Sequence, residues 1–462
     1  MRVLAGALAM AALALTACRT AESPISLVVV GQHVVTQNAA GDVLSPGAVA
    51  IDGDRIVAVG TPEAIRAGYA ARDVLDAADQ IVLPGLINTH THAPMVMYRG
   101  LADDLALMEW LNAYIFPAEA KTVSPEMVRI GTRLAALEMI ESGTTTYADM
   151  YYFEEEIAKA TRTAGLRGVL GQTVIQFPVA DARTPAEALA RAERLIDVFK
   201  GDPLIVPAVA PHAMYTLDAA TLKAAAALAR THAVPLLIHL AETEEERRQS
   251  YARHRLSPTA YLDSLGFWGP RTLAAHGVWV DDEDLAILAR HHVAVSHNPE
   301  SNMKLASGTA PVVQYLNAGV TVGLGTDGAA SNNDLDMFEA MRQAALLAKL
   351  ATMDPTALPA RAALAMATVR GAASLGLADI TGSLEVGKRA DLIAVAVDSA
   401  RETPLYDPIS HLVYVTRGSD VRTTIVNGRI LMRNRRTLTL DRDAVRADAI
   451  RLAAEVRKAV GR

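Results

Sequence analysis

The order of hydrophobic and polar positions predicts alternating strands and helices through the middle of the chain. Short runs of β-branched and other apolar residues alternate there with Ala-, Leu-, Glu- and Arg-rich stretches that open on Ser, Thr or Pro, as helices do. Clear helical stretches fall at residues 124–142, 184–200 and 217–232. Eight strand–helix units over about 300 residues predict a (β/α)8 barrel. The strand candidates are residues 83–90, 144–150, 167–174, 204–212, 235–242, 272–278, 293–298 and 320–327.

Both ends of the chain carry a different pattern, made of short strands and turns. Residues 25–83 contain β-branched runs broken by Gly, Asp and Pro, with an Asp-Gly pair that signals a hairpin. A similar texture returns at residues 385–440, ahead of a last helical stretch at 441–462. Chain ends often lie close together in folded domains. We therefore expect one small β-sandwich domain built from both ends, beside a barrel that spans residues 84–384.

Residues 1–18 form a further unit. One positive charge precedes an uncharged Ala/Leu-rich run and then Cys18, which is the layout of a signal peptide. The ending Leu15-Thr16-Ala17-Cys18 resembles the lipobox of bacterial lipoproteins, in which the cysteine is lipidated. Cys18 is the only cysteine, so an exported chain can form no internal disulfide. We expect an exported protein, lipid-anchored in the bacterial cell envelope. Arg19 follows where an inner-membrane lipoprotein has aspartate, which favours the outer membrane or periplasm.

Composition narrows the range of partners. Hydrophobic residues make up 51% of the chain and charged residues 21%, which allows a large core and argues against disorder. The formal charge of −7 and the lack of a Lys/Arg cluster argue against a nucleic-acid partner. After the leader, no segment approaches the roughly 20 uninterrupted apolar residues of a membrane span. Any membrane contact is therefore expected through the lipid anchor alone.

Nearly every candidate barrel strand ends in an ionisable side chain. The first ends in two histidines two positions apart, which point to the same face of a strand and together suit a divalent metal. Active sites of such barrels lie at the carboxyl ends of the strands. Burying many unpaired polar groups at one rim is costly unless a ligand offsets the cost. The residues at these ends are His90, His92, Asp149, His212, His239, Glu242, His276, His297 and Asp327.

This set, in this order, resembles the amidohydrolase superfamily and in particular its mononuclear deaminase branch. The segments "GLINTHTHAPM", "HLAET", "AAHGVW", "SHNPESNMKLASG" and "GLGTDGAASNN" are similar to those of deaminases that act on methylthioadenosine and S-adenosylhomocysteine. Triazine and pterin hydrolases share much of this pattern. The resemblance runs from about Ile25 to Arg436. It implies hydrolytic deamination of an adenine nucleoside (5′-methylthioadenosine, adenosine or S-adenosylhomocysteine), with release of ammonia and the inosine analogue.

The resemblance implies one divalent metal ion, held by His90, His92, His239 and Asp327. Imidazole and carboxylate ligands without a thiolate suit Zn²⁺, with Fe²⁺ as the alternative on the same ligand types. Coordination brings the pKa of water down to about 7. A second metal would need a bridging lysine at the end of the fourth strand, where His212 stands instead. We therefore expect a single metal.

The resemblance also assigns the proton transfers. Asp327 takes the proton of the attacking water, Glu242 protonates a ring nitrogen as general acid and base, and His276 orients the water. Glu242 directly follows a strand end, whereas residues 244–246 belong to a charged run that we expect to be solvated.

For the substrate, the resemblance points to Glu119 as the acceptor of the ribose hydroxyls. His212 and Asn302 are further substrate-binding candidates, His297 is a weaker one, and Trp110 could wall the purine pocket. From the sequence alone, a helix-surface position for Glu119 and a core position for Trp110 stay open.

Relatives that accept S-adenosylhomocysteine have arginines for its carboxylate. One of these positions is Gln172 here, and the other corresponds only loosely to Arg183. Because a fork-like arginine is lost, the sequence favours methylthioadenosine, adenosine or a similar small nucleoside.

Two other functions remain as alternatives. One is an aminohydrolase or chlorohydrolase of another heterocycle, such as guanine, cytosine, a pterin or a triazine. The other is a lipid-anchored protein that binds a purine without turning it over. The cytidine-deaminase type of zinc site is excluded, because it needs a Cys-x-x-Cys pair. Related enzymes are often dimers or larger, so the resemblance leaves a homo-oligomer open.

Overall fold

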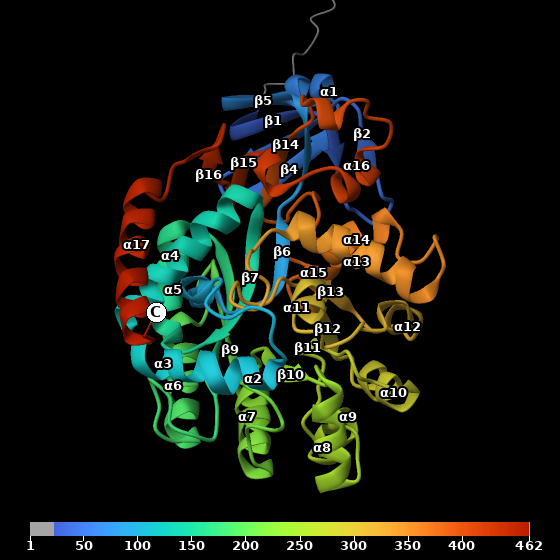
Figure 1. Ribbon diagram of the computed structural model, residues 1–462. Helices are drawn as coiled ribbons and strands as arrows, with labels where there is room; N and C mark the ends of the chain where they lie inside the picture. The colour runs from blue at the N-terminus through green and yellow to red at the C-terminus, as the bar shows by residue number, and fades with distance from the viewer. Residues whose placement is uncertain (1–22, 462) are drawn as a thin grey trace, which may run out of the picture.

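The computed structural model describes residues 23–461 as two sheets with their covering helices (Figure 1). Eight parallel strands, paired in chain order, form the barrel, which confirms the predicted (β/α)8 fold. At the seam, the N–H of Asp327 donates to the carbonyl of His90 at 2.9 Å and joins the last strand to the first. The strands are β6 (Leu86–Thr91), β7 (Thr144–Tyr151), β8 (Arg167–Val174), β9 (Ile205–Pro211), β10 (Leu236–Leu240), β11 (Thr272–His276), β12 (Ala294–His297) and β13 (Val322–Leu324).

The helices around the barrel begin and end where local chemistry predicts. Ser124 and Thr184 cap α4 and α6 with their hydroxyls, and a proline occupies the first turn of each helix. Gly143 ends α4 at φ +90°, in the left-handed region that favours glycine. The helices of the barrel are α4 (Pro125–Ser142), α5 (Glu154–Ala164), α6 (Pro185–Phe199), α7 (Ala219–His232), α8 (Glu244–His254), α9 (Pro258–Ser264), α10 (Asp282–Arg290), α11 (Pro299–Lys304), α12 (Val312–Asn317), α13 (Met337–Thr352), α14 (Ala360–Met366) and α15 (Val369–Ser374).

The segment between β6 and α4 is a series of short helices. It carries two of the predicted substrate residues, Trp110 and Glu119. Trp110 opens a π-helical turn, a rare element that recurs at functional sites. The elements are η1 (Ala93–Tyr98), α2 (Leu107–Glu109), η2 (Trp110–Ile115) and α3 (Phe116–Thr122).

Both ends of the chain build one small β domain, as predicted. Its strands hydrogen-bond into a single nine-stranded sheet, in which β5 from the first part pairs antiparallel with β14 from the last part. Apolar residues from both parts, among them Leu27 and Leu392, share one buried cluster. The strands are β1 (Ser23–Val35), β2 (Val43–Leu44), β3 (Gly47–Asp52), β4 (Arg55–Gly60), β5 (Tyr69–Pro84), β14 (Leu392–Ala396), β15 (Val421–Val426), β16 (Arg429–Arg433) and β17 (Arg436–Thr437), with α1 (Pro62–Gly68), η3 (Ala400–Glu402), α16 (Pro408–Tyr414) and η4 (Gly418–Asp420).

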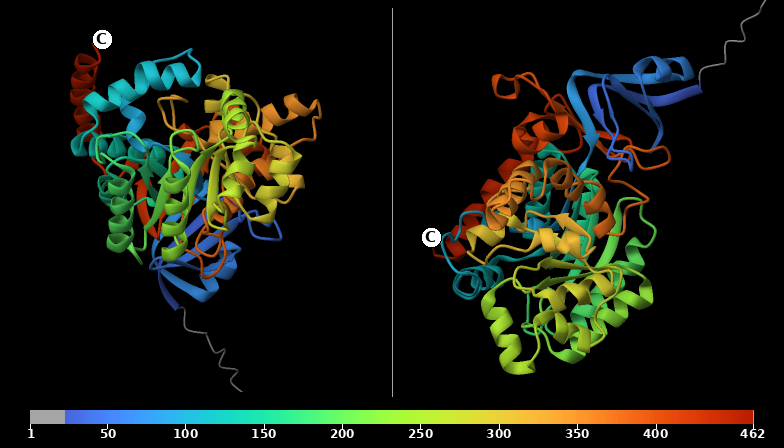
Figure 2. Two further views of the ribbon diagram at one scale, coloured as in Figure 1. Left: turned by 90° about the horizontal axis from the view of Figure 1, so that it is seen from below. Right: turned by 90° about the vertical axis from the view of Figure 1, so that its right-hand side faces the viewer.

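The β domain lies at the amino ends of the barrel strands, away from their carboxyl ends (Figures 1 and 2). Thr424 in β15 donates to the carbonyl of Ile140, near the end of α4. The last helix, α17 (Arg442–Ala459), lies along the flank of the barrel on α4 and α3. Arg451 of α17 contacts Glu126 at 2.8 Å.

Within residues 23–461, no helix combines the length and apolar character needed to cross a bilayer. Cys18 and the rest of the predicted leader lie outside the described residues.

Candidate active site

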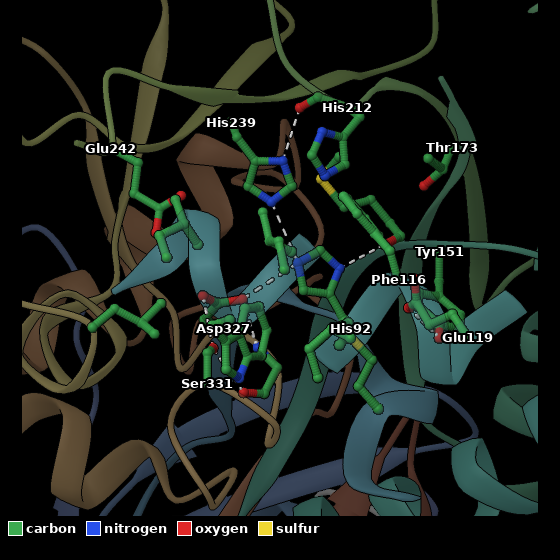
Figure 3. A pocket seen from close by; sticks show the side chains of 18 of the residues that line it. His92, Phe116, Glu119, Tyr151, Thr173, His212, His239, Glu242, Asp327 and Ser331 are labelled. Carbon is green, nitrogen blue, oxygen red and sulfur yellow. Dashed lines mark hydrogen bonds and ion pairs between the residues drawn. The ribbon is translucent and has the colours of Figure 1, made fainter. Parts of the chain in front are cut away.

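Four side chains meet where the barrel strands end, three of which, His92, His239 and Asp327, are labelled in Figure 3. His90 lies in β6 and His92 directly follows it, His239 lies in β10, and Asp327 follows β13. The Nε2 atoms of His92 and His239 are 3.3 Å apart. One carboxylate oxygen of Asp327 lies 3.5 Å from His90 Nε2 and 3.3 Å from His92 Nε2. The structure thus brings the four predicted metal ligands together, at distances that one shared ion can bridge.

Backbone carbonyls orient two of the imidazoles. Nδ1 of His92 lies 2.7 Å from the Met150 carbonyl, and Nδ1 of His239 lies 2.8 Å from the His212 carbonyl. Because a carbonyl only accepts, each Nδ1 carries the proton and each Nε2 presents its lone pair to the centre, as in metal sites. Nε2 of His90 is buried, and no described residue lies within hydrogen-bond distance and geometry of it. These nitrogens are arranged to receive an ion.

The charge states also suit a metal. Burial lowers the pKa of His90 to about 4 and that of His239 well below its ordinary value, so both rings are neutral at pH 7. Burial alone would raise the pKa of Asp327, but the surrounding imidazoles, His90 first, lower it well below its ordinary value. Neutral imidazoles and an ionised carboxylate are the forms that ligate metals. The residues present fit a divalent metal ion.

Two serines hold the Asp327 carboxylate. Ser301 Oγ and Ser331 Oγ lie 2.7 and 3.0 Å from the same oxygen of Asp327. The Gly328 N–H donates to the other oxygen at 2.6 Å. Neither serine is among the site residues that the sequence predicts. In the sequence, their only distinguishing feature is their position in the two segments that follow β12 and β13. These segments contain several other polar residues that could equally contact Asp327.

Glu242 and His276 lie close to Asp327 and line the same pocket. Nε2 of His276 is 3.8 Å from Glu242 and 3.9 Å from Asp327. Burial lowers the pKa of His276, but the two carboxylates outweigh burial and raise this pKa. Burial raises the pKa of Glu242. A carboxyl group with a raised pKa holds a proton that it can give to a substrate.

The expectation that residues 244–246 are all solvated is wrong for Glu246. This residue is 6% exposed, and its carboxylate accepts hydrogen bonds from the backbone N–H groups of Ala241 and Glu242. Glu244 is exposed, and Glu245 pairs with Arg248 near the surface. The charged run gives no sign of which carboxylate turns inward.

One pocket joins the metal ligands to Glu119. Glu119 and Glu242 lie on opposite sides of His92 and His239 (Figure 3). The Tyr151 hydroxyl donates to Glu119 at 2.6 Å, and burial raises the Glu119 pKa to about 7. Glu119 is buried in the pocket wall instead of lying on a helix surface.

Trp110 and His212 also line this pocket. Trp110 is buried, and its Nε1 has no hydrogen-bond partner within the described residues. His212 lies beside His239, with ring centroids 4.7 Å apart, and burial lowers the His212 pKa to about 3. The two aromatic rings therefore form part of the wall near the metal ligands.

The structure does not bring Asn302 or Arg183 into the pocket. Asn302 lies behind His276, where its Oδ1 is 2.9 Å from the ring Nδ1, because α11 places it against the far edge of that ring. Arg183 is exposed in the loop before α6, and its backbone N–H is bonded to Glu187. Gln172 is buried and donates to Asp181 at 2.9 Å. His297 is buried at the end of β12, outside the pocket wall.

Comparison with known proteins agrees with this geometry. A 5-methylthioadenosine/S-adenosylhomocysteine deaminase of Syntrophobacter fumaroxidans is 49% identical over 423 residues, 92% of this chain and 96% of that protein. A 5′-deoxyadenosine deaminase of Methanosarcina mazei is 44% identical over 432 residues, 93% and 98% of the two chains. The crystal structure of an adenosine deaminase from Xanthomonas campestris with bound zinc superposes with a TM-score of 0.93, at 39% identity, over 95% of this chain and all of that one.

Family models match two parts of the chain. Residues 47–71 match an imidazolonepropionase-like composite domain of bacteria. Residues 81–431, which hold the barrel and every pocket residue described above, match the amidohydrolase family. The protein is therefore a hydrolase that belongs to the amidohydrolase family.

Proposed function

We propose that the protein is a Zn²⁺-dependent deaminase of adenine nucleosides, which replaces the ring amino group by oxygen and releases ammonia. The observation that carries this proposal is the layout of one pocket. A buried acid, Glu242, lies at one side of the histidine cluster, and a second carboxylate, Glu119, lies at the other. The first suits proton transfer to a heterocycle, and the second suits hydrogen bonds from ribose hydroxyls. The names of the relatives support the same reaction.

Zinc is proposed because the donor set is three imidazole nitrogens and one carboxylate oxygen, without a thiolate. The relative of known structure also holds zinc. A divalent metal bound here supplies Lewis acidity that makes water a good nucleophile at neutral pH. His90, His92, His239 and Asp327 would hold it.

The chain's own groups carry the protons. Asp327, ionised and close to the imidazoles, accepts a proton from the attacking water, and His276 hydrogen-bonds and orients that water. Glu242, protonated, gives its proton to the ring nitrogen next to the carbon under attack. A C–O bond forms, Asp327 passes the water proton to the amino group, and the C–N bond breaks as ammonia leaves. The proton of the remaining hydroxyl group returns to Glu242, which restores the acid. Such acid–base catalysis contributes about 10²–10⁴-fold in rate.

A second, apolar hollow supports nucleosides with an uncharged 5′ substituent. It adjoins the first pocket at Phe116, Glu119 and Tyr152, and its further wall is formed by residues 177–180, Phe-Pro-Val-Ala. Among the described residues, no lysine or arginine lines either hollow. Arg191, which is close by, is paired with Asp181 at 3.2 Å. A carboxylate on the substituent, as in S-adenosylhomocysteine, would lack a cation partner.

Ammonia release by the Zn²⁺-supplied protein tests the function. The substrates are adenosine, 5′-methylthioadenosine, 5′-deoxyadenosine, S-adenosylhomocysteine, guanine, cytosine and a pterin, with Glu242→Gln as control. We expect turnover of the nucleosides, with S-adenosylhomocysteine the poorest of them. Activity on a free base alone would transfer the assignment to the alternative heterocycle hydrolases. Tight nucleoside binding without turnover would support the binding-protein alternative.

We also propose that Cys18 carries a lipid that anchors the enzyme in the cell envelope. The support is the sequence of residues 1–18 alone. Labelling of cells with radioactive palmitate should mark the protein, and Cys18→Ser should release it from the membrane fraction. An unlabelled protein in the cytosolic fraction would contradict this.

A further inference from the structure

Glu246 lies in the first turn of α8, yet its carboxylate turns back along the chain. One oxygen accepts a hydrogen bond from the N–H of Ala241 and the other accepts one from the N–H of Glu242, both at 3.0 Å. Because Glu246 is buried, these bonds compete little with water. A carboxylate that accepts from backbone N–H groups makes stronger bonds than a neutral acceptor. Glu246 therefore fixes, through two hydrogen bonds, the backbone segment that carries the Glu242 side chain.

The turn at residues 241–242, which Glu246 holds, has an unusual backbone conformation. Ala241 has φ +47°, in the left-handed region that residues with a Cβ rarely adopt. Such conformations persist only where the surroundings hold them. The loop after β11 holds the carbonyl side of the turn, since the N–H groups of Val278 and Trp279 donate to the Ala241 carbonyl at 3.1 and 2.9 Å. Glu246 supplies the acceptors for the N–H side.

This contact differs from ordinary helix capping. Thr243 is the N-cap of α8, and its hydroxyl accepts from the Glu246 N–H at 3.2 Å. In a capping box, the third helical residue returns its side chain to the N–H of the cap itself. Glu246 occupies that third position, but its carboxylate reaches past Thr243 to the two preceding residues. The cap is thus made by Thr243, and Glu246 holds the turn.

We propose that Glu246 is a positioning residue that sets the direction of the Glu242 carboxyl group for proton transfer. The proposal rests on the proposed function, in which Glu242 carries the proton. Glu242 lies 3.8 Å from Nε2 of His276, a separation that a small rotation of the turn would change. Displacing a catalytic group by about 1 Å can cost about 100-fold in rate. Loosening the turn should therefore lower kcat, while the metal ligands and the Glu119 end of the pocket stay in place.

The variant Glu246→Gln tests this in the full-length, Zn²⁺-loaded enzyme, on whichever substrate of the panel it turns over fastest. The amide keeps one acceptor but sets an NH₂ group against the second backbone N–H. We expect kcat to fall about 10- to 100-fold with KM and zinc content unchanged. Glu244→Gln is the matched control, because it makes the same carboxyl-to-amide change on an exposed neighbour. Its kcat should equal that of the wild type.

Two further variants separate positioning from stability. Thr243→Ala removes the helix cap and should lower Tm while kcat stays unchanged. In a Glu242→Gln background, Glu246→Gln should cause no additional loss of kcat, because the group that it positions is already gone. Glu246→Asp, which keeps the charge but is one methylene shorter, replaces Glu246→Gln if the latter does not fold. It should show the same loss of kcat at constant KM.

The outcomes are distinct. A kcat of Glu246→Gln equal to that of Glu244→Gln would overturn the proposal, and so would independent, multiplying losses from the changes at 242 and 246. A wild-type enzyme that turns over only a free base would overturn the nucleoside function, and the Glu246 comparison would still be decisive on that base.

Discussion

At the amino end of the barrel, Arg167 opens β8 and pairs with Asp391, the residue before β14. Both side chains are almost completely buried, at 3% and 0% exposure. The guanidinium makes bonds of 2.9 to 3.2 Å to the two carboxylate oxygens and one of 2.7 Å to the Pro203 carbonyl. The Asn427 N–H adds a further bond to Asp391. This buried pair is fully hydrogen-bonded and joins barrel to β domain.

The carboxyl end of the same barrel is different. Among the described residues, Nε2 of His90, one oxygen of Asp149 and Nε1 of Trp110 are buried there without a hydrogen-bond partner. Native proteins leave few buried polar atoms in this state, because each costs about 1–3 kcal/mol. The comparison separates two uses of buried polarity. The Arg167 and Asp391 side chains satisfy one another and hold the fold together, whereas the unpaired Nε2 of His90 lies among residues that suit a metal ion.

The largest expected effect comes from removing a metal ligand. His239→Ala deletes one of the converging imidazoles, so metal affinity should fall by about 100-fold or more and activity should be lost with it. Metal content by mass spectrometry of the purified protein, together with zinc titration, measures this. A variant that keeps one tightly bound metal per chain would contradict the assigned site.

Glu242→Gln should leave the metal in place and still remove most of the turnover. We expect kcat to fall about 10²–10⁴-fold, because the amide cannot donate a proton in place of the acid. Steady-state ammonia release and metal analysis of the same sample give both numbers. Near-normal kcat would mean that the proton comes from another group.

At the opposite end, Arg167→Met should destabilise the fold and spare catalysis. It leaves the Asp391 charge buried without a partner, which typically costs about 3–5 kcal/mol. Urea unfolding measures the loss, while kcat of the folded fraction should match the wild type. The exposed pair between Arg451 and Glu126 provides the control, since Arg451→Met should leave stability almost unchanged. A lower kcat in Arg167→Met would contradict the separation of a structural role at the amino end from a catalytic role at the carboxyl end.

The smallest effect concerns pH. Burial raises the Glu119 pKa from 4.5 to about 7, so between these values the folded state keeps a proton that the unfolded state has lost. Glu119 therefore makes stability fall as pH rises from about 4.5 through 7. The ionised carboxylate is the better acceptor for hydroxyls, so KM for adenosine should drop about fivefold as pH rises through 7. In Glu119→Gln, KM should lose this dependence. Tm should fall less over the same pH range, because other buried carboxyl groups, such as Asp149 and Glu246, also have raised pKa values. If the KM of the wild type does not change with pH, this would argue against a contact between Glu119 and the ribose.

The barrel and the convergence of the proposed metal ligands could be predicted because strand identity fixes position. His90, His239 and Asp327 sit where buried strands end, and parallel strands bring those ends to one rim. The positions of side chains on loops and helix ends are harder to predict from the sequence. Glu246 looks like its solvated neighbours in the sequence, since only the folded turn before it shows where its carboxylate goes. Asn302 was expected to touch substrate, yet α11 places it behind His276.

The seam of the barrel has a consequence for how the enzyme is made. His90 and His92 belong to the first barrel strand, whereas Asp327 follows the last and bonds back to His90. A growing chain thus exposes two ligands early and completes the set only after more than two hundred further residues have been added. An ion bound by all four side chains would link the first barrel strand to the last. Tight metal retention would then indicate complete molecules, because chains truncated before the last strand would lack the carboxylate of Asp327.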